Sequence, residues 1–216
     1  MSGYILFGGG PTRSMMTEMV FAEGKIAYEL REIDIFKRAH RTPEFLAINP
    51  FGWVPALVAP DGETISETPA INLWLCERHE LDLAPPPGNP ARGAFLTAFH
   101  NVVGEIEPTM KRVFFAHRYA LAKDQIEAAR NHAKKMLLDR IEPLERRLAS
   151  SGLYFLGERF SLADLTFLYW MAYVEDWGDL DGFPATKKAL DLARARPALA
   201  DIFARQADWI VRLKQQ

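Results

Sequence analysis

A proline-rich break constrains this chain more than any other feature of its sequence. Residues 81–90 read LDLAPPPGNP, with four prolines and one glycine. Because proline lacks a backbone N–H and fixes φ, this stretch can form neither a helix nor a central strand. The 216 residues of the chain suffice for one or two domains. We therefore predict two domains, at residues 1–82 and 90–216.

Strand and helix patterns alternate before the break. Short apolar or alternating runs predict strands at residues 4–7, 28–35, 54–58 and 63–66. Apolar residues at helical spacing predict helices at residues 12–22, 43–48 and 68–79. The order βαβαββα within about 80 residues is that of an α/β thioredoxin-like domain.

The patterns after the break are helical. The segments 91–119 and 124–150 carry apolar residues at helical spacing. Ser161 and Asp164 form a capping-box variant that opens the most apolar helix of the chain. The apolar stretch of that helix is ten residues long, whereas a membrane-spanning helix needs about 20. The sequence thus predicts an all-helical second domain and no membrane association.

Composition argues against several functions. The formal net charge of −2 argues against a nucleic-acid partner held by a basic surface. A single cysteine excludes a disulfide scaffold, a cysteine-based zinc site and a CxxC redox pair. The five histidines show no HxxxH or HxH spacing, so we expect no metal site. Residues 1–10 lack the basic start of a signal peptide, and we expect a cytoplasmic protein.

Three separated motifs resemble those of the cytosolic glutathione transferase family. They are PEFLAINPFGWVPAL at residues 43–57, SETPAI at 66–71 and GERFSLAD at 157–164. The resemblance covers the whole chain and implies a thioredoxin-like N-terminal domain followed by an all-α domain. It also implies a homodimeric detoxification enzyme that uses glutathione as cosubstrate, without a metal, against a small hydrophobic electrophile. Phe51 and the helix at 91–119 are then the expected dimer interface.

The same resemblance places glutathione on the first domain. Val54 precedes Pro55 in an expected cis peptide, which leaves the N–H and C=O of Val54 to pair with an extended ligand. Glu67 and Thr68 stand where a helix begins, so Thr68 faces the γ-glutamyl carboxylate and Glu67 its ammonium group. A turn followed by an ordinary helix cap is the alternative interpretation of Glu67 and Thr68.

Four residues concern the glycyl end of glutathione. His40 matches a histidine that binds near the cysteinyl-glycine part in several classes of the family, and an exposed loop histidine is the alternative. Lys37 and Arg38 are nearby cations for the glycyl carboxylate, or are merely solvated. Trp53 stands where many members of the family carry Gln or Lys. A side-chain donor to the glycyl carboxylate is therefore missing at this position, or His40 supplies it.

Activation of the glutathione thiol requires a donor to its sulfur. Lowering a thiol pKa by about 2 units needs about 2.7 kcal/mol. A helix N-terminus supplies about 0.3–1 kcal/mol, up to about 2 when partly buried, and one hydrogen bond to the anion supplies about 1.5–3 kcal/mol. The family places Tyr, Ser or Cys just after the first strand or at the start of the first helix, but these positions fall on Leu6, Gly9 and Gly10.

The remaining hydroxyls near this loop belong to Thr12 and Ser14. We hypothesise that Thr12, helped by the backbone N–H of Gly10 or Thr12, stabilises the thiolate, because three successive glycines let the backbone approach a sulfur closely. A helix cap at Thr12 and a helix-surface position at Ser14 are the alternatives. The one cysteine, Cys76, is predicted to be a small core residue, which argues against a mixed-disulfide mechanism through the protein.

The electrophile is expected to bind between the two domains. The candidate side chains for this site are Phe7, Met15, Phe99, Val103, Phe114 and His117. A place in the core is the alternative for each of them. Two further functions stay open. One is a glutathione-binding module with little catalysis, in a regulatory or interaction role. The other is glutathione-dependent ether cleavage or isomerisation at the same site.

Overall fold

The computed structural model describes residues 3–215, which divide into two compact units. Unit 1 joins the residues up to Ala84 to those from Arg194 onward, and unit 2 spans Pro85–Ala193. The first two residues and the last one, which the predicted domain bounds include, lie outside the described residues. The C-terminal residues thus group with the N-terminal unit, whereas the sequence pattern grouped them with the other helices.

Unit 1 is built on a four-stranded mixed sheet with the order β2-β1-β3-β4. Its strands are β1 (Tyr4–Gly8), β2 (Tyr28–Glu32), β3 (Ala56–Val58) and β4 (Thr64–Ser66). β2 runs parallel to β1, whereas β3 is antiparallel to both β1 and β4. The helices of this part are α1 (Ser14–Gly24), α2 (Pro43–Ile48) and α3 (Thr68–Arg78). This is the predicted order βαβαββα, and the thioredoxin-like fold class is confirmed.

The second strand ends three residues earlier than its alternating pattern predicts. Ile33 still donates its N–H to the Gly8 carbonyl, at 2.7 Å. The Asp34 carboxylate then accepts the N–H groups of Phe36 and Lys37, both at 3.0 Å. This local turn replaces the hydrogen bonds of the sheet, because an Asp side chain readily bonds the backbone a few residues further on.

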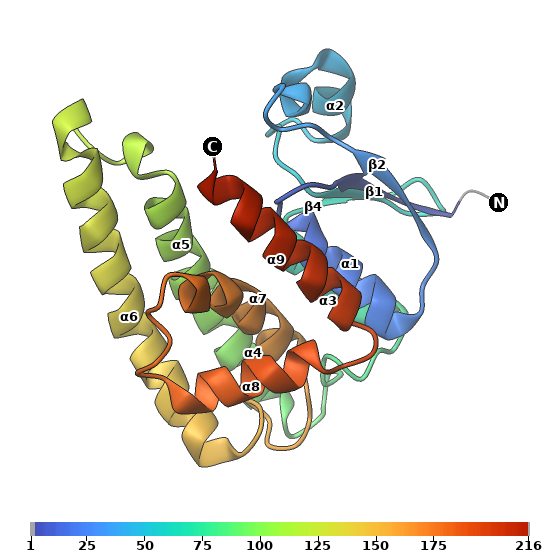
Figure 1. Cartoon of the computed structure of the whole chain (residues 1–216). Helices are drawn as coiled ribbons and strands as arrows, with labels where there is room; N and C mark the ends of the chain where they lie inside the picture. Colours follow the sequence, from blue (N-terminus) through green and yellow to red (C-terminus); the bar gives the residue numbers. More distant parts are fainter. Residues whose placement is uncertain (1–2, 216) are drawn as a thin grey trace. The chain divides into compact units, whose positions relative to one another are not determined.

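The last helix of the chain, α9 (Ala200–Lys214), lies alongside α1 in unit 1 (Figure 1). Arg196, which precedes α9, binds both carboxylate oxygens of Glu23, at 2.7 and 2.8 Å. Arg205 on α9 lies 3.0 Å from the carboxylate of Glu18, a side chain that is only 3% exposed. Because a buried carboxylate requires such a partner, these ion pairs explain why α9 packs with this unit.

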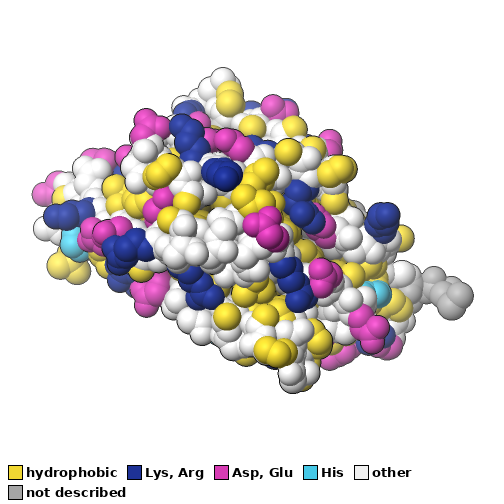
Figure 2. Space-filling model, turned by 90° about the horizontal axis from the view of Figure 1, so that it is seen from below, with side chains coloured by type: hydrophobic (Ala, Val, Ile, Leu, Met, Phe, Trp, Pro, Cys, Tyr) yellow, Lys and Arg dark blue, Asp and Glu magenta, His cyan; other side chains and the backbone are white. Residues whose placement is uncertain are grey.

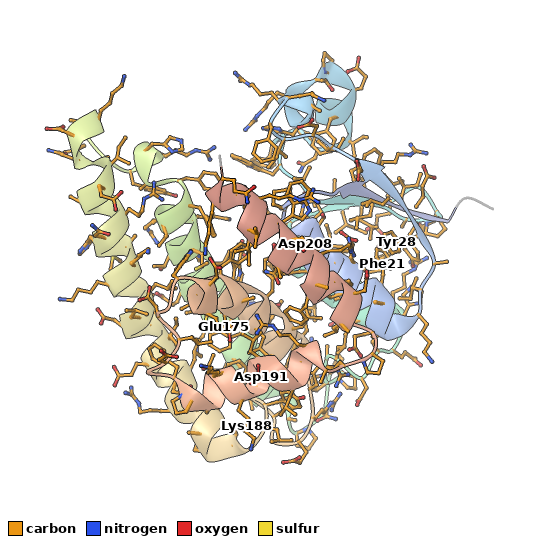
Figure 3. All side chains as sticks on the ribbon, viewed as in Figure 1. Phe21, Tyr28, Glu175, Lys188, Asp191 and Asp208 are labelled. Carbon is orange, nitrogen blue, oxygen red and sulfur yellow. The ribbon has the colours of Figure 1, made fainter. Side chains whose placement is uncertain are left out.

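The carboxylate of Glu18 also anchors the second strand. Tyr28 donates its hydroxyl to Glu18 at 3.3 Å, and its ring stacks on Phe21 of α1 with 4.4 Å between the centroids (Figure 3). Burial, together with the charge of Glu18, raises the pKa of Tyr28 to about 12. The hydroxyl therefore stays protonated at neutral pH and remains a donor. Helix α1 is thereby tied to both β2 and α9.

Helices make up unit 2. They are α4 (Arg92–Asn101), a π-helical turn (Val102–Ile106), α5 (Glu107–Phe114), α6 (Ile126–Ser151), α7 (Leu162–Asp176) and α8 (Pro184–Arg194). The all-α character of this part is confirmed, but the helix predicted at 91–119 is interrupted. Pro108, at the second position of α5, has no N–H to donate to the carbonyl of Gly104. The π-helical turn, which is wider than an α-helical turn, lies directly before α5.

Helix α7 opens with the predicted capping box. Asp164 accepts the N–H of Ser161 at 2.9 Å, the hydroxyl of Ser161 at 2.6 Å and the N–H of Phe155 at 2.8 Å. Burial raises the pKa of Asp164 to about 6. Nearly all of α7 is buried. Of the helices that the structure describes, none has both the length and the apolar character needed to span a membrane.

Candidate functional site

The strand register brings three sequence motifs to one end of the sheet in unit 1. Phe7 pairs with Ala56, and Ala56 pairs with Ser66. At this end β1 runs into the glycine-rich loop, β3 begins after Val54–Pro55, and β4 ends before Glu67. The loop, the Val54–Pro55 peptide and the start of α3 therefore lie side by side, although they are far apart in the sequence.

The Val54–Pro55 peptide is cis, as predicted. Neither the N–H nor the C=O of Val54 is bonded to another described residue. The preceding loop is held by Asn49, which donates its amide to the carbonyl of Trp53 at 2.7 Å and accepts the N–H of Phe51 at 3.2 Å. A fixed loop thus presents one backbone donor and one acceptor, the arrangement with which an extended peptide pairs.

Thr68, the first residue of α3, is buried without a hydrogen-bond partner. The residue is 1% exposed, and within residues 3–215 nothing bonds its Oγ1. A buried hydroxyl with no partner costs about 1–3 kcal/mol, so this one points to a ligand that supplies the partner. Backbone N–H groups at the start of an 11-residue helix favour an anion at the same place.

Charged side chains lie beside this hydroxyl. Glu67 adopts a φ of 69°, in the left-handed region, and 56% of its side chain is exposed. Such a backbone costs about 1–3 kcal/mol at a residue other than glycine, which is typical of ligand sites. Arg13, at the start of α1, lies 3.7 Å from the Glu67 carboxylate and is only 14% exposed. The corner therefore combines an acceptor for an ammonium group with a cation for a carboxylate.

The glycine-rich loop after β1 is fixed by the two hydroxyls near its end. Ser14 accepts the N–H of Gly9 at 2.8 Å, and Thr12 donates to the carbonyl of Gly9 at 2.9 Å. The two hydroxyl oxygens lie 2.9 Å from each other. Ser14 is fully buried, so the alternative of a helix-surface position is wrong, and Thr12 is 8% exposed. Both side chains hold the loop, and Thr12 alone of the two keeps some exposed surface.

Gly10 contributes a backbone donor to this loop. Its φ of +60° lies in the region that glycine adopts without steric cost. Its N–H forms no hydrogen bond within the described part of the chain, and the residue is half-buried. An anionic sulfur at this place would thus meet the Gly10 N–H, the hydroxyl of Thr12 and the start of α1.

His40 and Trp53 lie on the other side of Val54. His40 is half-buried and belongs to a short turn. A Cβ on Gly52 would lie 2.8 Å from the carbonyl oxygen of His40. Arg41 donates to the carbonyl of Phe51 at 3.1 Å and lies over the Trp53 ring, 4.8 Å from its centroid. Trp53 is 41% exposed. Arg41 thus adds a cation beside Trp53.

The six candidates for the electrophile site differ in exposure. Three of them are at most 7% exposed, namely Phe7, Met15 and Phe99. Their burial does not support the prediction that they line a substrate site. The other three, Val103, Phe114 and His117, are partly or fully exposed.

The lone cysteine lies in the core, as predicted. Cys76 is 2% exposed, and burial raises the pKa of its thiol to about 12. The thiol therefore stays protonated and unreactive at neutral pH. Across residues 3–215, no three His, Cys, Asp or Glu side chains are grouped so as to hold a metal ion.

Surface charges of both signs alternate on one face of the molecule. Figure 2 shows Lys and Arg side chains interspersed with Asp and Glu side chains on this face, with hydrophobic side chains between them. Such mixing keeps the local potential low, and it agrees with the formal net charge of −2.

Family models match both parts of the chain. "Glutathione S-transferase, N-terminal domain" matches residues 13–78, and "Glutathione S-transferase, C-terminal domain" matches residues 127–205. The disulfide-bond oxidoreductase YfcG from Escherichia coli is 31% identical over 190 residues, which cover 82% of this chain and 83% of the relative. The chain belongs to the glutathione S-transferase family. The predicted family is confirmed.

Other glutathione S-transferase relatives agree in length and fold. Maleylacetoacetate isomerase from Pseudomonas aeruginosa is 28% identical over 195 residues, covering 87% of this chain and 89% of the isomerase. A glutathione transferase homolog from Sulfitobacter, solved with bound glutathione, has a TM-score of 0.84 at 22% identity and covers 95% of this chain and 99% of its own. The glutathione S-transferase fold is confirmed, and the family supports the predicted class of a glutathione-using enzyme.

Two residues of the candidate site were not predicted from the sequence. Arg13 meets Glu67 because the sheet register brings the end of β4 to the start of α1. Arg41 meets Trp53 because of the path of one loop. No motif or spacing signals either contact, since each depends on tertiary packing.

Proposed function

We propose that the chain is a glutathione transferase whose unit 1 binds glutathione. The observation that carries this proposal is the buried hydroxyl of Thr68, which no described residue bonds. Thr68 and the N–H groups at the start of α3 bind the γ-glutamyl carboxylate, with Arg13 nearby. Glu67 binds the ammonium group, and the backbone of Val54 pairs with the cysteinyl residue.

The glycyl carboxylate is assigned to the side of Val54 that carries His40 and Trp53. Arg41, held over the Trp53 ring, supplies the cation there. Lys37 instead pairs with Asp34 at 3.2 Å, so it is a weaker candidate. His40 is the second polar partner in this proposal.

Replacing Thr68 by valine is expected to weaken glutathione binding by about 10–100-fold. Valine keeps the branched shape and removes the hydroxyl, and a hydrogen bond to a charged group contributes about 1.5–3 kcal/mol. Isothermal titration calorimetry measures the affinity. Thr68→Ser keeps the hydroxyl and should bind nearly as well as wild type, while Thr64→Val, at an exposed threonine of β4, is the matched control. Unchanged affinity in Thr68→Val would contradict the proposed site.

The proposed reaction is attack of the glutathione thiolate on a small apolar electrophile. The Thr12 hydroxyl, released from the Gly9 carbonyl, and the Gly10 N–H stabilise the anionic sulfur, while Ser14 positions the loop. The thiol proton leaves to solvent and a sulfur lone pair forms the new C–S bond. The leaving group departs with the electron pair of the bond that breaks. Val103, Phe114 and His117 stay predictions of the sequence as contacts of the electrophile.

Thr12→Ala is expected to raise the pKa of the bound glutathione thiol by about 1 unit, because one donor to the anion is lost. The ultraviolet absorbance of the thiolate as a function of pH measures this pKa. Ser14→Ala is expected to lower the free energy of unfolding by about 1–3 kcal/mol, since it leaves the Gly9 N–H buried and unpaired. Its effect on the thiol pKa should be smaller. An unchanged thiol pKa in Thr12→Ala would refute the role of that hydroxyl.

A second candidate reaction is glutathione-dependent disulfide exchange. The name of the Escherichia coli relative, a disulfide-bond oxidoreductase, favours it. The bound thiolate would attack one sulfur of a disulfide, forming a mixed disulfide and releasing the other sulfur as a thiolate. A second glutathione would then resolve the mixed disulfide to oxidised glutathione. This route needs no cysteine of the protein, which fits the burial of Cys76.

Substrate assays separate the remaining alternatives. Isomerisation, which the name of the Pseudomonas relative favours, and ether cleavage would use the same thiolate. A glutathione-binding module would bind glutathione without turning over a chloronitroaromatic, a small disulfide or an isomerisable enone. The homodimer, with the 72% exposed Phe51 at its interface, and the cytoplasmic, detoxifying role stay predictions of the sequence.

A further inference from the structure

Helix α9 brings an aromatic side chain to the glycine-rich loop of unit 1. A Cβ built on Gly10 would lie 4.0 Å from Cζ2 of Trp209, the nearest atom outside the adjoining residues. A Cβ at this position would be in ordinary van der Waals contact with the indole ring, so the loop and the ring lie close together. Trp209 therefore lies beside the place that the proposed function assigns to the sulfur of glutathione.

The position of Trp209 is fixed from within unit 1. The two ion pairs of Arg196 with Glu23 and of Arg205 with Glu18 attach α9 to α1 near the start of α9 and at its middle. Ile210, next to Trp209, is buried on the same helix. The indole and the sulfur site are thus held by one packed unit.

A cation stands over the indole ring. The guanidinium carbon of Arg212 lies 5.2 Å from the centroid of the Trp209 ring. No carboxylate of a described residue lies within 4.0 Å of this guanidinium. This includes the carboxylate of Asp208, which lies one turn earlier on α9 and is labelled in Figure 3. A guanidinium presents five N–H donors in a planar fork that suits a carboxylate. Arg212 therefore has donors to offer to an anionic ligand beside Trp209.

We propose that Trp209 and Arg212 select the second substrate, and that this substrate is a flat, conjugated electrophile carrying a carboxylate. The inference rests on the proposed function, since it takes glutathione sulfur to lie at the Gly10 loop. The conjugated part packs against the indole, and the carboxylate meets the guanidinium. Both residues are specificity-determining, and neither takes part in bond making.

The test compares two probes that differ in one charge, 4-chloro-3,5-dinitrobenzoate and its methyl ester. With either probe the thiolate forms a C–S bond to the ring carbon, the C–Cl bond breaks, and chloride leaves with the electron pair. Relative to the uncatalysed rates with glutathione, wild type should favour the benzoate in kcat/KM. Arg212→Gln should lower kcat/KM for the benzoate about 10-fold and leave the ester within about 2-fold, as loss of one exposed charge-assisted contact implies. Lys214→Gln, which removes a cation from the same last turn, is the matched control and should change neither.

Trp209→Ala should lower kcat/KM for both probes, whereas Trp209→Phe should retain most of it, because phenylalanine keeps an aromatic surface. Equal effects of Arg212→Gln on the two probes would overturn the assignment of the carboxylate. Normal rates in Trp209→Ala would overturn the role of the indole.

A binding measurement keeps this proposal separate from the proposed function. The glutathione conjugates of the two probes are titrated by calorimetry, so no turnover is needed. The carboxylate conjugate should bind more tightly than the ester conjugate, and Arg212→Gln should remove the difference. If glutathione itself does not bind, the proposed function fails and the inference fails with it. If glutathione binds but Arg212→Gln leaves the preference between the conjugates unchanged, the inference alone is overturned.

Discussion

Replacing Gly8 by alanine is expected to lower the free energy of unfolding by roughly 3 kcal/mol or more. Gly8 ends β1, and a Cβ on it would overlap the Cβ of Ser14 and lie 2.6 Å from Ser14 Oγ. The position of the Ser14 Cβ is fixed by its backbone, so β1 or α1 must shift. The shift would also break the hydrogen bond from Gly9 to Ser14. Urea denaturation measures the loss of stability, and glutathione titration reports whether the loop still forms the site.

Gly93→Ala is the matched control for this change. Gly93 lies at an exposed position of α4, and a Cβ on it would meet no atom within 4 Å. Alanine there should leave the stability unchanged or raise it by up to about 1 kcal/mol, because alanine favours the helix. The double variant of Gly8→Ala with Ser14→Gly removes the clashing atoms and should recover part of the loss. A wild-type denaturation midpoint in Gly8→Ala would disprove the tight packing of the loop against α1.

Replacing Asp164 by alanine is expected to cost roughly 3–5 kcal/mol of stability. The Asp164 carboxylate is 1% exposed and accepts three hydrogen bonds, from Ser161 N–H, Ser161 Oγ and Phe155 N–H. Alanine leaves these donors buried without a partner, at the start of the most buried helix of unit 2. Chemical denaturation followed by far-ultraviolet circular dichroism measures the effect. Asp139→Ala, at an exposed position of α6, should stay within about 0.5 kcal/mol of wild type.

The pH dependence of the same carboxyl provides a second readout. Its pKa is raised from 3.8 to about 6 by burial, so the folded state favours the protonated form. A raised pKa contributes stability that is complete below about pH 3.8 and is lost as the pH rises through about 6. The stability of wild type relative to Asp164→Asn, which does not titrate, should therefore fall between about pH 4 and pH 7. A difference that stays constant over this range would contradict the raised pKa.

Local chemistry made several elements predictable. The helix at 43–48 has its predicted bounds because Thr42 accepts the N–H of Phe45 at 3.4 Å and Pro43 takes the first helical position. The capping box of α7 was predictable for the same reason, since Ser161 and Asp164 are three residues apart. In contrast, apolar spacing did not reveal the π-helical turn at Val102–Ile106, because spacing does not report how the helix accommodates a missing donor.

The candidate site was predictable only in part. Val54 and Thr68 belong to short motifs, and the order of the strands already places these motifs at one end of a thioredoxin-like sheet. The choice between Thr12 and Ser14 was not predictable, because both hydroxyls stand near the start of one helix. Packing against Gly8 buries Ser14 completely and leaves Thr12 partly exposed.

The sequence by itself determined the family and the order of strands and helices, and it predicted which motif residues bind glutathione. Tertiary structure alone decided that Arg13 meets Glu67, that Ser14 lies against Gly8, and that α9 packs on α1 so that Trp209 stands beside Gly10. The physical reason is the range of the interactions. Caps, turns and periodic apolar faces depend on residues that are close in the sequence. Contacts between distant segments depend instead on strand register, buried ion pairs and the fit of one surface to another.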